Sequence, residues 1–257
     1  MKQRLGLAVV CVGLMMAAIQ ARAAESAPEL AKPGKSLFVD DFSRADLKPK
    51  WRVGKGFFTV KDGVVSVAEN PEDKHGAYAY VTPGFAYKDI VAEFSIKMDG
   101  ARSCSLMVND SKYKESHAGH ILKATVAMGK VNVADWKFGA MKNEIFDKMK
   151  DTNTSAEEKK KLRESIKDKS ADFKVDADMA QWHVVRVQIA GDEMLVSLDG
   201  KPAAYLKSEG INHAAKNAIG FEVGGKSVLI KDMKVWEAAP ASDWAAHRDA
   251  VVASIKK

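Results

Sequence analysis

Apolar and polar residues alternate along most of this chain, and the alternation is clearest at residues 181–200. Val185, Val187 and Ile189 alternate with polar neighbours as far as a turn at Gly191, and a second alternating run follows it. Side chains of a β-strand point to opposite faces in turn, so a period of two indicates a strand with one buried face. Residues 181–200 are therefore predicted to form a β-hairpin.

The same period returns in short runs throughout residues 36–237, with turn residues such as Asp62-Gly63 between the runs. We expect further strands at residues 36–42, 57–61, 64–68, 77–82, 89–98, 103–110, 119–128, 131–136, 203–206, 218–223 and 227–236. About a dozen short strands separated by turn residues are typical of a two-layered β-sandwich of the jelly-roll type. Residues 36–237 are accordingly predicted to form one all-β sandwich domain.

The alternation stops at residues 137–180, where charged residues dominate. Ser155 and Glu158 form a capping box, which predicts a helix over residues 156–169. A shorter helix is expected at residues 142–149, where apolar residues recur on one side. We interpret this charged block as a helical insertion between two strands, lying on the surface or rim of the sandwich. Disorder of part of the block is the alternative.

The two ends of the chain differ from the sandwich region. An apolar stripe predicts a C-terminal helix at residues 241–256, and the aperiodic residues 24–35 are predicted to be a linker. Residues 1–23 combine a basic start, an apolar run and an Ala-Arg-Ala end, which is the pattern of a secretory signal peptide. The apolar run is shorter than the roughly 20 residues of a membrane span. We therefore expect an exported protein, periplasmic or secreted, that does not span a membrane.

Charge and cysteine content narrow the classes of partner. The net charge is +6, and removal of three cations with residues 1–23 leaves +3, so we expect no nucleic-acid partner. Cys104 is then the only cysteine, which excludes an internal disulfide. It alternates in phase with apolar neighbours and is interpreted as a buried residue. Stability must therefore come from the hydrophobic core.

Short motifs in the last third of the chain resemble a known family. These motifs are Trp182-His183, Leu198-Asp199-Gly200 and Ile230-Lys231-Asp232-Met233. With the start at residues 38–42, they are similar to concanavalin-A-like jelly rolls, and in particular to the bacterial 3-keto-disaccharide hydrolase domains grouped with family 16 glycoside hydrolases. The resemblance implies a concanavalin-A-like jelly-roll sandwich that hydrolyses a glycoside or 3-keto-glycoside. The segments at residues 103–110 and 120–126 depart from the family pattern.

The densest cluster of candidate catalytic residues lies just before the predicted strand at residues 119–128. His117 and His120, with Asp110 before them, are the catalytic candidates. Residues three apart on a strand point to opposite faces, and no third ligand is evident, so we predict no metal there. Two interpretations remain open: a polar loop at the mouth of a glycan groove, or ordinary loop and edge histidines.

Candidate ligand-binding residues lie on consecutive predicted strands. Ser105, Asn109, Lys123, Asn132 and Trp136 all fall on the outward side of the alternation, so they would cover the solvated face of one sheet. An aromatic ring beside amides and a lysine suits a sugar, whose CH face stacks and whose hydroxyls form hydrogen bonds. The alternative is that Trp136 packs under the charged insertion.

Paired carboxylates and cation ligands are sparse. Jelly-roll glycosidases of the family 16 type carry Glu-x-Asp-x-Glu on one strand, and this chain has no such triplet. Asp176 and Asp178 have the right spacing but lie in a polar loop. We expect no cofactor, although Asp40, Asp41 and Asp232, on the first and last strands, offer oxygen ligands for a structural Ca²⁺ ion.

Three hypotheses follow for the function. The first is an exported carbohydrate-active jelly-roll protein that hydrolyses a glycoside or 3-keto-glycoside. The second is a non-catalytic glycan-binding module that uses the same sheet face. The third is a cell-envelope interaction protein whose insertion and C-terminal helix contact a partner. The sequence does not determine the oligomeric state.

Overall fold

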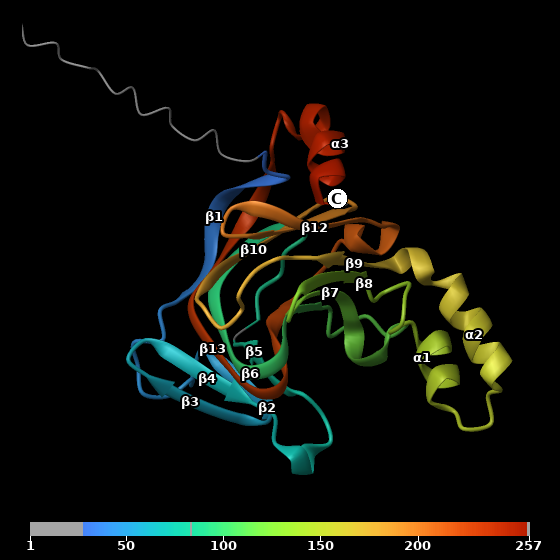
Figure 1. Cartoon of the computed structure of the whole chain (residues 1–257), viewed down its shortest axis with the longest axis horizontal. Coiled ribbons are helices and arrows are strands. Elements are labelled where there is room, and N and C mark those ends of the chain that lie inside the picture. Colours follow the sequence, from blue (N-terminus) through green and yellow to red (C-terminus); the bar gives the residue numbers. More distant parts are fainter. Residues whose placement is uncertain (1–27, 83, 256–257) are drawn as a thin grey trace, which may run out of the picture.

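The computed structural model describes residues 28–82 and 84–255 (Figure 1). The predicted signal peptide lies outside these residues. Their strands are β1 (Ala31–Asp40), β2 (Trp51–Lys55), β3 (Phe57–Lys61), β4 (Val64–Ala68), β5 (Ala77–Val81), β6 (Ile90–Asn109), β7 (His120–Ala127), β8 (Lys130–Asp135), β9 (Ser170–Lys174), β10 (His183–Ala190), β11 (Glu193–Leu198), β12 (Lys201–Lys207) and β13 (Ala218–Pro240). The helices are α1 (Asn143–Lys150), α2 (Ala156–Ser165) and α3 (Trp244–Ile255).

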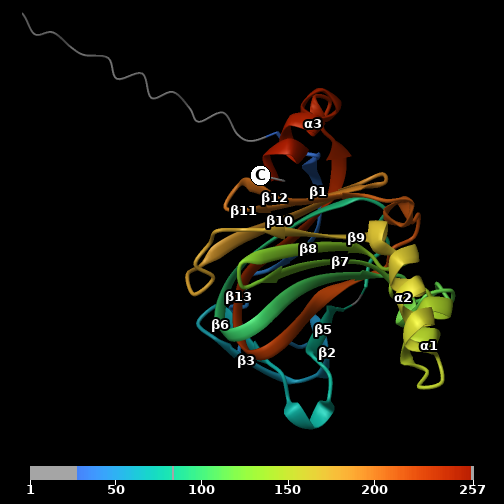
Figure 2. The same ribbon diagram turned by 45° about the vertical axis from the view of Figure 1, so that its right-hand side comes forward.

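Two long antiparallel strands, β6 and β13, connect the two layers of the sandwich. Their pairing shifts register near Gly100 and Gly225, which both have positive φ, and there the strands bend from one layer to the other (Figure 2). One half of the pair forms the front sheet, in the order β2-β5-β13-β6-β7-β8-β9. The other half belongs to the back sheet with β10, β11 and β12, flanked by β1 and by β4-β3.

The hydrophobic core lies between the two sheets and is built from the alternation read in the sequence. Leu106 and Phe221 of the front sheet and Phe94, Val187 and Ile230 of the back sheet are all buried in one cluster. The side chain of Cys104 joins them, and burial raises the pKa of its thiol to about 12. The predicted all-β sandwich with one charged helical insertion and a C-terminal helix is therefore confirmed.

The hairpin predicted at residues 181–200 is β10-β11 of the back sheet. Val185 pairs with Leu198, and Ala190 pairs with Glu193 across the turn. Its other edge lies along β6, where Val187 pairs with Ala92. The hairpin thus forms part of the back sheet, on the other side of the core from the outer face of the front sheet.

Several elements differ from the prediction. β2 was not predicted, and the predicted strands at residues 89–98 and 103–110 form one strand, β6, as those at residues 218–223 and 227–236 form β13. β1 begins at Ala31, inside the predicted linker, because Ala31 is buried and its N–H donates to Gln188 Oε1 at 3.0 Å. The helix α2 begins as predicted at the Ser155 cap but ends at Ser165 rather than residue 169. The charged block ends in a strand, β9, whose Phe173 pairs with Val131. This strand was missed because it lies in the charged block and Phe173 is its one buried residue.

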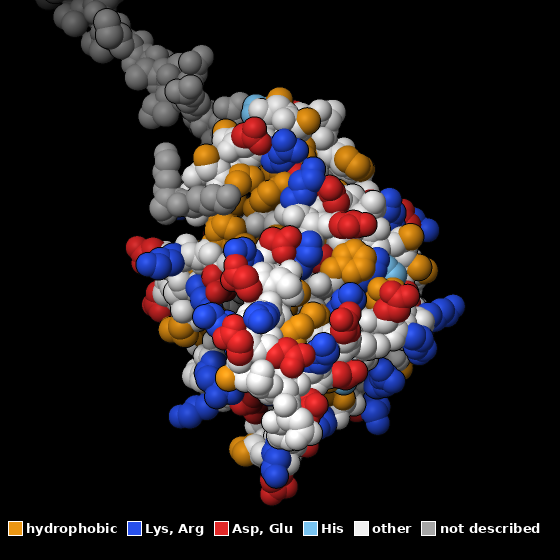
Figure 3. Space-filling view, turned by 90° about the vertical axis from the view of Figure 1, so that its right-hand side faces the viewer, with side chains coloured by type: hydrophobic (Ala, Val, Ile, Leu, Met, Phe, Trp, Pro, Cys, Tyr) orange, Lys and Arg blue, Asp and Glu red, His pale blue; other side chains and the backbone are white. Residues whose placement is uncertain are grey.

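Three further observations concern the candidate Ca²⁺ ligands, a membrane-spanning helix and the surface that carries the insertion. Asp40 is buried, and its carboxylate accepts hydrogen bonds from the Arg44 guanidinium and from Trp51 Nε1, so donors of the protein already occupy both of its oxygens. Within the described residues no helix is long and apolar enough to cross a bilayer. The face that carries the insertion shows acidic and basic side chains interspersed with small apolar patches (Figure 3).

Candidate functional site

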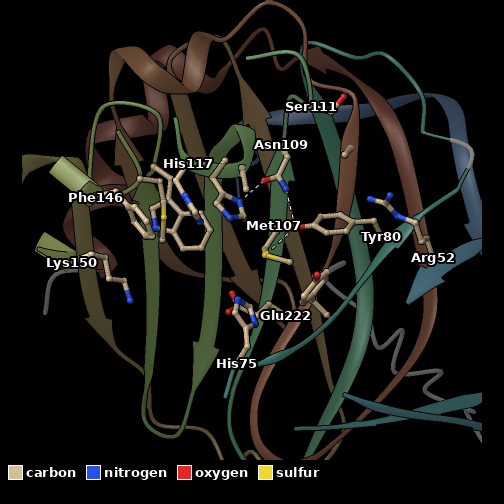
Figure 4. A pocket seen from close by; sticks show the side chains of 16 residues that line it. Arg52, His75, Tyr80, Met107, Asn109, Ser111, His117, Phe146, Lys150 and Glu222 are labelled. Atoms are coloured by element: carbon tan, nitrogen blue, oxygen red, sulfur yellow. Dashed lines mark hydrogen bonds between the residues drawn. The ribbon is translucent and has the colours of Figure 1, made fainter. Parts of the chain in front are cut away.

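A cavity of about 550 Å³ opens on the outer face of the front sheet (Figure 4). Strands β5, β13 and β6 form its floor, and residues of β2 and α1 stand at its sides. A volume of this size lies within the range of roughly 300–1,000 Å³ that is usual for small-molecule sites. The front sheet can form such a site because its other face alone supplies the core.

Two tyrosines of β5 form an aromatic platform in the cavity. Tyr78 and Tyr80 alternate with the buried Ala77 and Ala79, so their rings lie on the outer face. Their ring centroids are 5.8 Å apart. The rings have room because glycines lie beneath them: a Cβ on Gly54 would come 1.9 Å from the ring of Tyr78, and a Cβ on Gly220 2.7 Å from that of Tyr80.

A chain of hydrogen bonds crosses the floor of the cavity from His120 to Met107 (Figure 4). His120 Nδ1 lies 3.0 Å from Asn109 Oδ1, and Asn109 Nδ2 donates to the Tyr80 hydroxyl at 2.9 Å. The Tyr80 hydroxyl in turn donates to the sulfur of Met107 at 3.6 Å. Because an amide oxygen only accepts, Nδ1 of His120 carries the proton. Its Nε2 then presents a lone pair, which has no partner among the described residues.

The protonation states along this chain are set mainly by burial. Burial, and then the nearby charge of His117, lower the pKa of His120 to about 4. Burial also raises the pKa of Tyr80 to about 12. Around neutral pH the imidazole of His120 is therefore an uncharged acceptor, and the phenol of Tyr80 keeps its proton.

The opposite wall of the cavity is aromatic and is built by the insertion. The ring of His117 stacks on Phe146 of α1 with centroids 3.8 Å apart, and His120 meets Trp136 edge to face at 4.8 Å. Backbone hydrogen bonds hold this part of the insertion against the segment before β7; one of them runs from His117 N to Met141 O at 2.7 Å. The start of the helical insertion therefore closes one side of the cavity.

Both histidine candidates line this cavity because the chain bends between them. Ala118 and Gly119 have φ values of 52° and 70°, which breaks the strand alternation. A Cβ on Gly119 would lie 2.1 Å from the carbonyl oxygen of Asp110. The bend brings the rings of His117 and His120 to a centroid distance of 6.1 Å. Asn109 and Trp136 also line the cavity, as the ligand-binding prediction requires.

Three other predicted ligand-binding residues lie on the same face but beside the cavity. Ser105 and Asn132 are both in register with Thr125 of β7, and the hydroxyls of Ser105 and Thr125 are 2.9 Å apart. Asn132 donates to the carboxylate of Asp172 on the edge strand β9 at 3.0 Å. Lys123 does not line the cavity, but its ammonium forms an ion pair with Glu222, which does. Asn132 and Lys123 thus extend the outer face beyond the cavity, whereas Ser105, predicted on the solvated face, is buried because neighbouring strands cover it on both sides.

Only one carboxylate, Glu222, lines the cavity among the described residues. Its Oε2 lies 2.6 Å from Lys123 Nζ, and the same ammonium lies 4.6 Å from the ring centre of Trp136. The charge of Glu222 is thus neutralised by a neighbour on the sheet. The cavity contains no second carboxylate with which Glu222 could act.

Asp110, predicted as catalytic, lies outside the cavity. It follows Asn109 on the chain, and consecutive side chains point to opposite sides. Its carboxylate accepts from His213 Nε2 at 2.9 Å and from Asn217 Nδ2 at 2.9 Å. Burial alone would raise the pKa of Asp110, but the hydrogen bonds from His213 and the Lys112 backbone lower it. Asp110 therefore anchors a loop.

Sequence reasoning missed several residues of the cavity. Tyr78, Tyr80, Glu222, Phe146 and Lys150 line it without having been singled out. One signal was present for the tyrosines, because the run Ala-Tyr-Ala-Tyr puts two aromatic rings on the solvated side of a strand. For the other three, no local pattern indicates that they meet the histidines.

Comparisons with known proteins find similarity in structure only. No protein-family model and no curated protein matches the sequence. The laminarinase from Rhodothermus marinus superposes with a TM-score of 0.56 at 11% identity, over 82% of this chain and all of that one. The endo-β-1,3-glucanase from Pyrococcus furiosus gives 0.54 at 10% identity, over 83% of this chain and all of that one. A protein of unknown function with a galectin-like fold from Bacillus subtilis gives 0.51 at 14% identity, over 82% and 100%.

Proposed function

We propose that this protein, whose fold is a concanavalin-A-like jelly roll, binds a carbohydrate in the cavity of the front sheet. The observation that carries the proposal is the composition of the cavity walls. Tyr78 and Tyr80 stand on one side, Trp136 on the other, and the polar groups of Asn109 and His120 lie between them. Apolar walls with a few fixed polar groups are usual for a small-molecule site.

Each part of the wall suits a different part of a sugar. The CH face of a pyranose ring stacks on an aromatic ring, as Tyr78 or Trp136 offers. A sugar hydroxyl can donate to the free Nε2 of His120, whose other nitrogen is held by Asn109. The similarity in fold to a laminarinase and an endo-β-1,3-glucanase is consistent with a carbohydrate ligand.

The residues of the cavity favour binding of a carbohydrate over its hydrolysis by a pair of carboxylates. Retaining cleavage needs two carboxyl groups about 5 Å apart, and inverting cleavage needs two about 6.5–9.5 Å apart. Among the described residues that line the cavity, Glu222 has no such partner and is paired with Lys123 instead. A carbohydrate held here therefore does not meet a carboxylate pair.

Catalysis by His120 is the second candidate, and it would act on a glycoside or 3-keto-glycoside. A general base must be unprotonated and able to reach its substrate. His120 fulfils the first condition through its low pKa, and its free Nε2 fulfils the second. Tyr80, still protonated, could donate a proton on the same floor of the cavity.

The binding experiment uses the protein without residues 1–23. Isothermal titration and thermal shift are measured with neutral and acidic oligosaccharides and with 3-keto-disaccharides, and products are assayed in parallel. Replacement of both Tyr78 and Tyr80 by Ala should weaken binding at least about fivefold, since each stacked ring contributes about 0.5–1.5 kcal/mol. The exposed Phe57→Ala on β3 is the matched control. A protein that binds no carbohydrate would overturn the proposal.

The same samples decide between binding and catalysis. Stabilisation by a sugar without any product refutes the hydrolase and leaves the binding module. If product forms, His120→Gln should abolish it while the fold is retained. Turnover that survives this change would remove His120 from the catalytic role.

We also propose that the protein is exported to the periplasm or secreted. The proposal rests on the residue pattern of residues 1–23. Cell fractionation followed by N-terminal sequencing of the mature protein tests it. A cytoplasmic protein that still begins at Met1 would refute it.

A further inference from the structure

The charge of the cavity is positive once its internal pairs are counted. Glu222 and Lys123 neutralise one another, and the low pKa of His120 leaves that ring uncharged. Arg52 and Lys150 also line the cavity, and neither forms an ion pair with any residue that the structure describes. Two cationic groups therefore face the cavity, and no carboxylate among the described residues balances them.

Lys150 forms no ion pair among the described residues, whereas the nearby Lys148 does. Lys148, two residues earlier on α1, lies 3.3 Å from the carboxylate of Glu158 on α2. Lys150 instead lies 5.7 Å from the ring centre of Phe146, on the side of the helix that faces the cavity (Figure 4). At the end of α1, Lys148 thus contacts α2, and Lys150 faces the cavity.

Arg52 occupies the equivalent place on the other side. It pairs in register with Tyr80 across β2 and β5, and Figure 4 shows it on the opposite side of the cavity from Lys150. Each cation therefore stands next to an aromatic ring, Arg52 beside Tyr80 and Lys150 beside Phe146. A sugar chain that lies between the two walls of the cavity therefore has one cation near each of its ends.

Resting on the proposed carbohydrate site, we propose that its ligand is an acidic oligosaccharide with carboxylate or sulfate groups on more than one sugar. One acidic group pairs with Arg52, whose planar fork matches a carboxylate or a sulfate. A second acidic group pairs with Lys150 across the cavity. A neutral glucan leaves both cations unpaired, and its affinity is correspondingly lower.

The experiment compares three oligosaccharides of equal length by isothermal titration with the protein lacking residues 1–23. Tetragalacturonate carries carboxylates, a sulfated galactan tetrasaccharide carries sulfates, and laminaritetraose is neutral. At least one acidic sugar should bind more tightly than the neutral one, by about 2- to 25-fold, because one ion pair at an exposed site accounts for up to about fivefold and two sites multiply. Its affinity should fall as salt is raised, while that of laminaritetraose stays constant.

Two double variants distinguish the effect of the cations in the cavity from the effect of the net charge of the protein. The double change Arg52→Gln and Lys150→Gln should remove the preference for the acidic sugar and its salt dependence. The control, Lys160→Gln with Lys161→Gln, also removes two positive charges, but from the exposed surface of α2, and it should leave the affinity unchanged. An equal affinity for the three sugars, or an unchanged preference in the cavity variant, would overturn the inference and leave the carbohydrate site intact. Failure of all three sugars, and of the wider panel, would remove both proposals.

Discussion

Replacement of Gly220 by Ala tests how the sheet makes room for the aromatic platform. Gly220 lies in β13 between β5 and β6, with Tyr80 as its partner on β5. A Cβ at this position would lie 2.2 Å from the carbonyl oxygen of Ala79 and 2.7 Å from the ring of Tyr80. The backbone of Gly220 is not left-handed, so the clash alone disfavours a side chain.

The expected loss of stability depends on which atoms can move to relieve the clash. The carbonyl of Ala79 belongs to a strand that is paired on both sides, so relief of the clash disturbs the β5-β13 ladder. Overpacking of this kind costs about 1–3 kcal/mol, and the change from Gly to Ala in a strand returns about 0.5–1 kcal/mol. Gly220→Ala should therefore lower the free energy of unfolding by about 1–2 kcal/mol. It should also tilt Tyr80 away from Asn109.

Gly224→Ala is the matched control on the same strand. The nearest atom to a Cβ there would be the hydroxyl oxygen of Ser103, at 3.0 Å, and this hydroxyl can rotate away, while the next atoms lie at 3.9 Å. Urea unfolding of both variants gives the two free energies, and sugar titration shows whether the platform is intact. Equal stability of the two variants, or unchanged sugar binding by Gly220→Ala, would refute the steric argument.

Three further predictions concern the core, pH and the insertion. Asp40→Asn should lower the free energy of unfolding by about 3–5 kcal/mol in urea titration at neutral pH, because the buried carboxylate accepts hydrogen bonds from Trp51 and Arg44. Burial alone would raise the pKa of Asp40, but these hydrogen bonds lower it. The stability that Asp40 contributes in the wild type should therefore disappear as the pH falls through that lowered pKa. Burial alone would lower the pKa of His183, but its hydrogen bonds to the Asp178 carbonyl and the Asp199 carboxylate raise it. Its contribution to stability should therefore be complete below its ordinary pKa of about 6.5 and vanish as the pH rises through the raised value, and a Tm profile of His183→Gln should lack this dependence. Phe146→Ala removes the ring that stacks on His117 and should raise the Kd of a bound sugar about fivefold with the Tm of the sandwich retained.

The sequence alone determined most of the strands and, for most of their residues, the face on which each lies. Alternation is local, because neighbouring side chains on a strand must point to opposite sides whatever the strand pairs with. It placed Val185 and Val187 in the core and put Asn109, Lys123 and Trp136 on a solvated face. The capping box at Ser155 likewise predicted the start of α2, since a cap depends only on the next few residues.

Only the tertiary structure decided which of these residues meet in one cavity. Lys123 pairs with Glu222, which lies 99 positions later in the chain, and Asn109 bonds to Tyr80, which lies 29 positions earlier. The placement of Phe146 over His117 depends on how the insertion docks, and the carboxylate of Asp110 is held by His213 and Asn217, which lie 103 and 107 positions later in the chain. Strand order and the docking of an insertion arise from contacts between distant segments, which leave no periodic mark in the sequence. The composition of each face is therefore local information, whereas the cavity, its charge and its chemistry are properties of the fold.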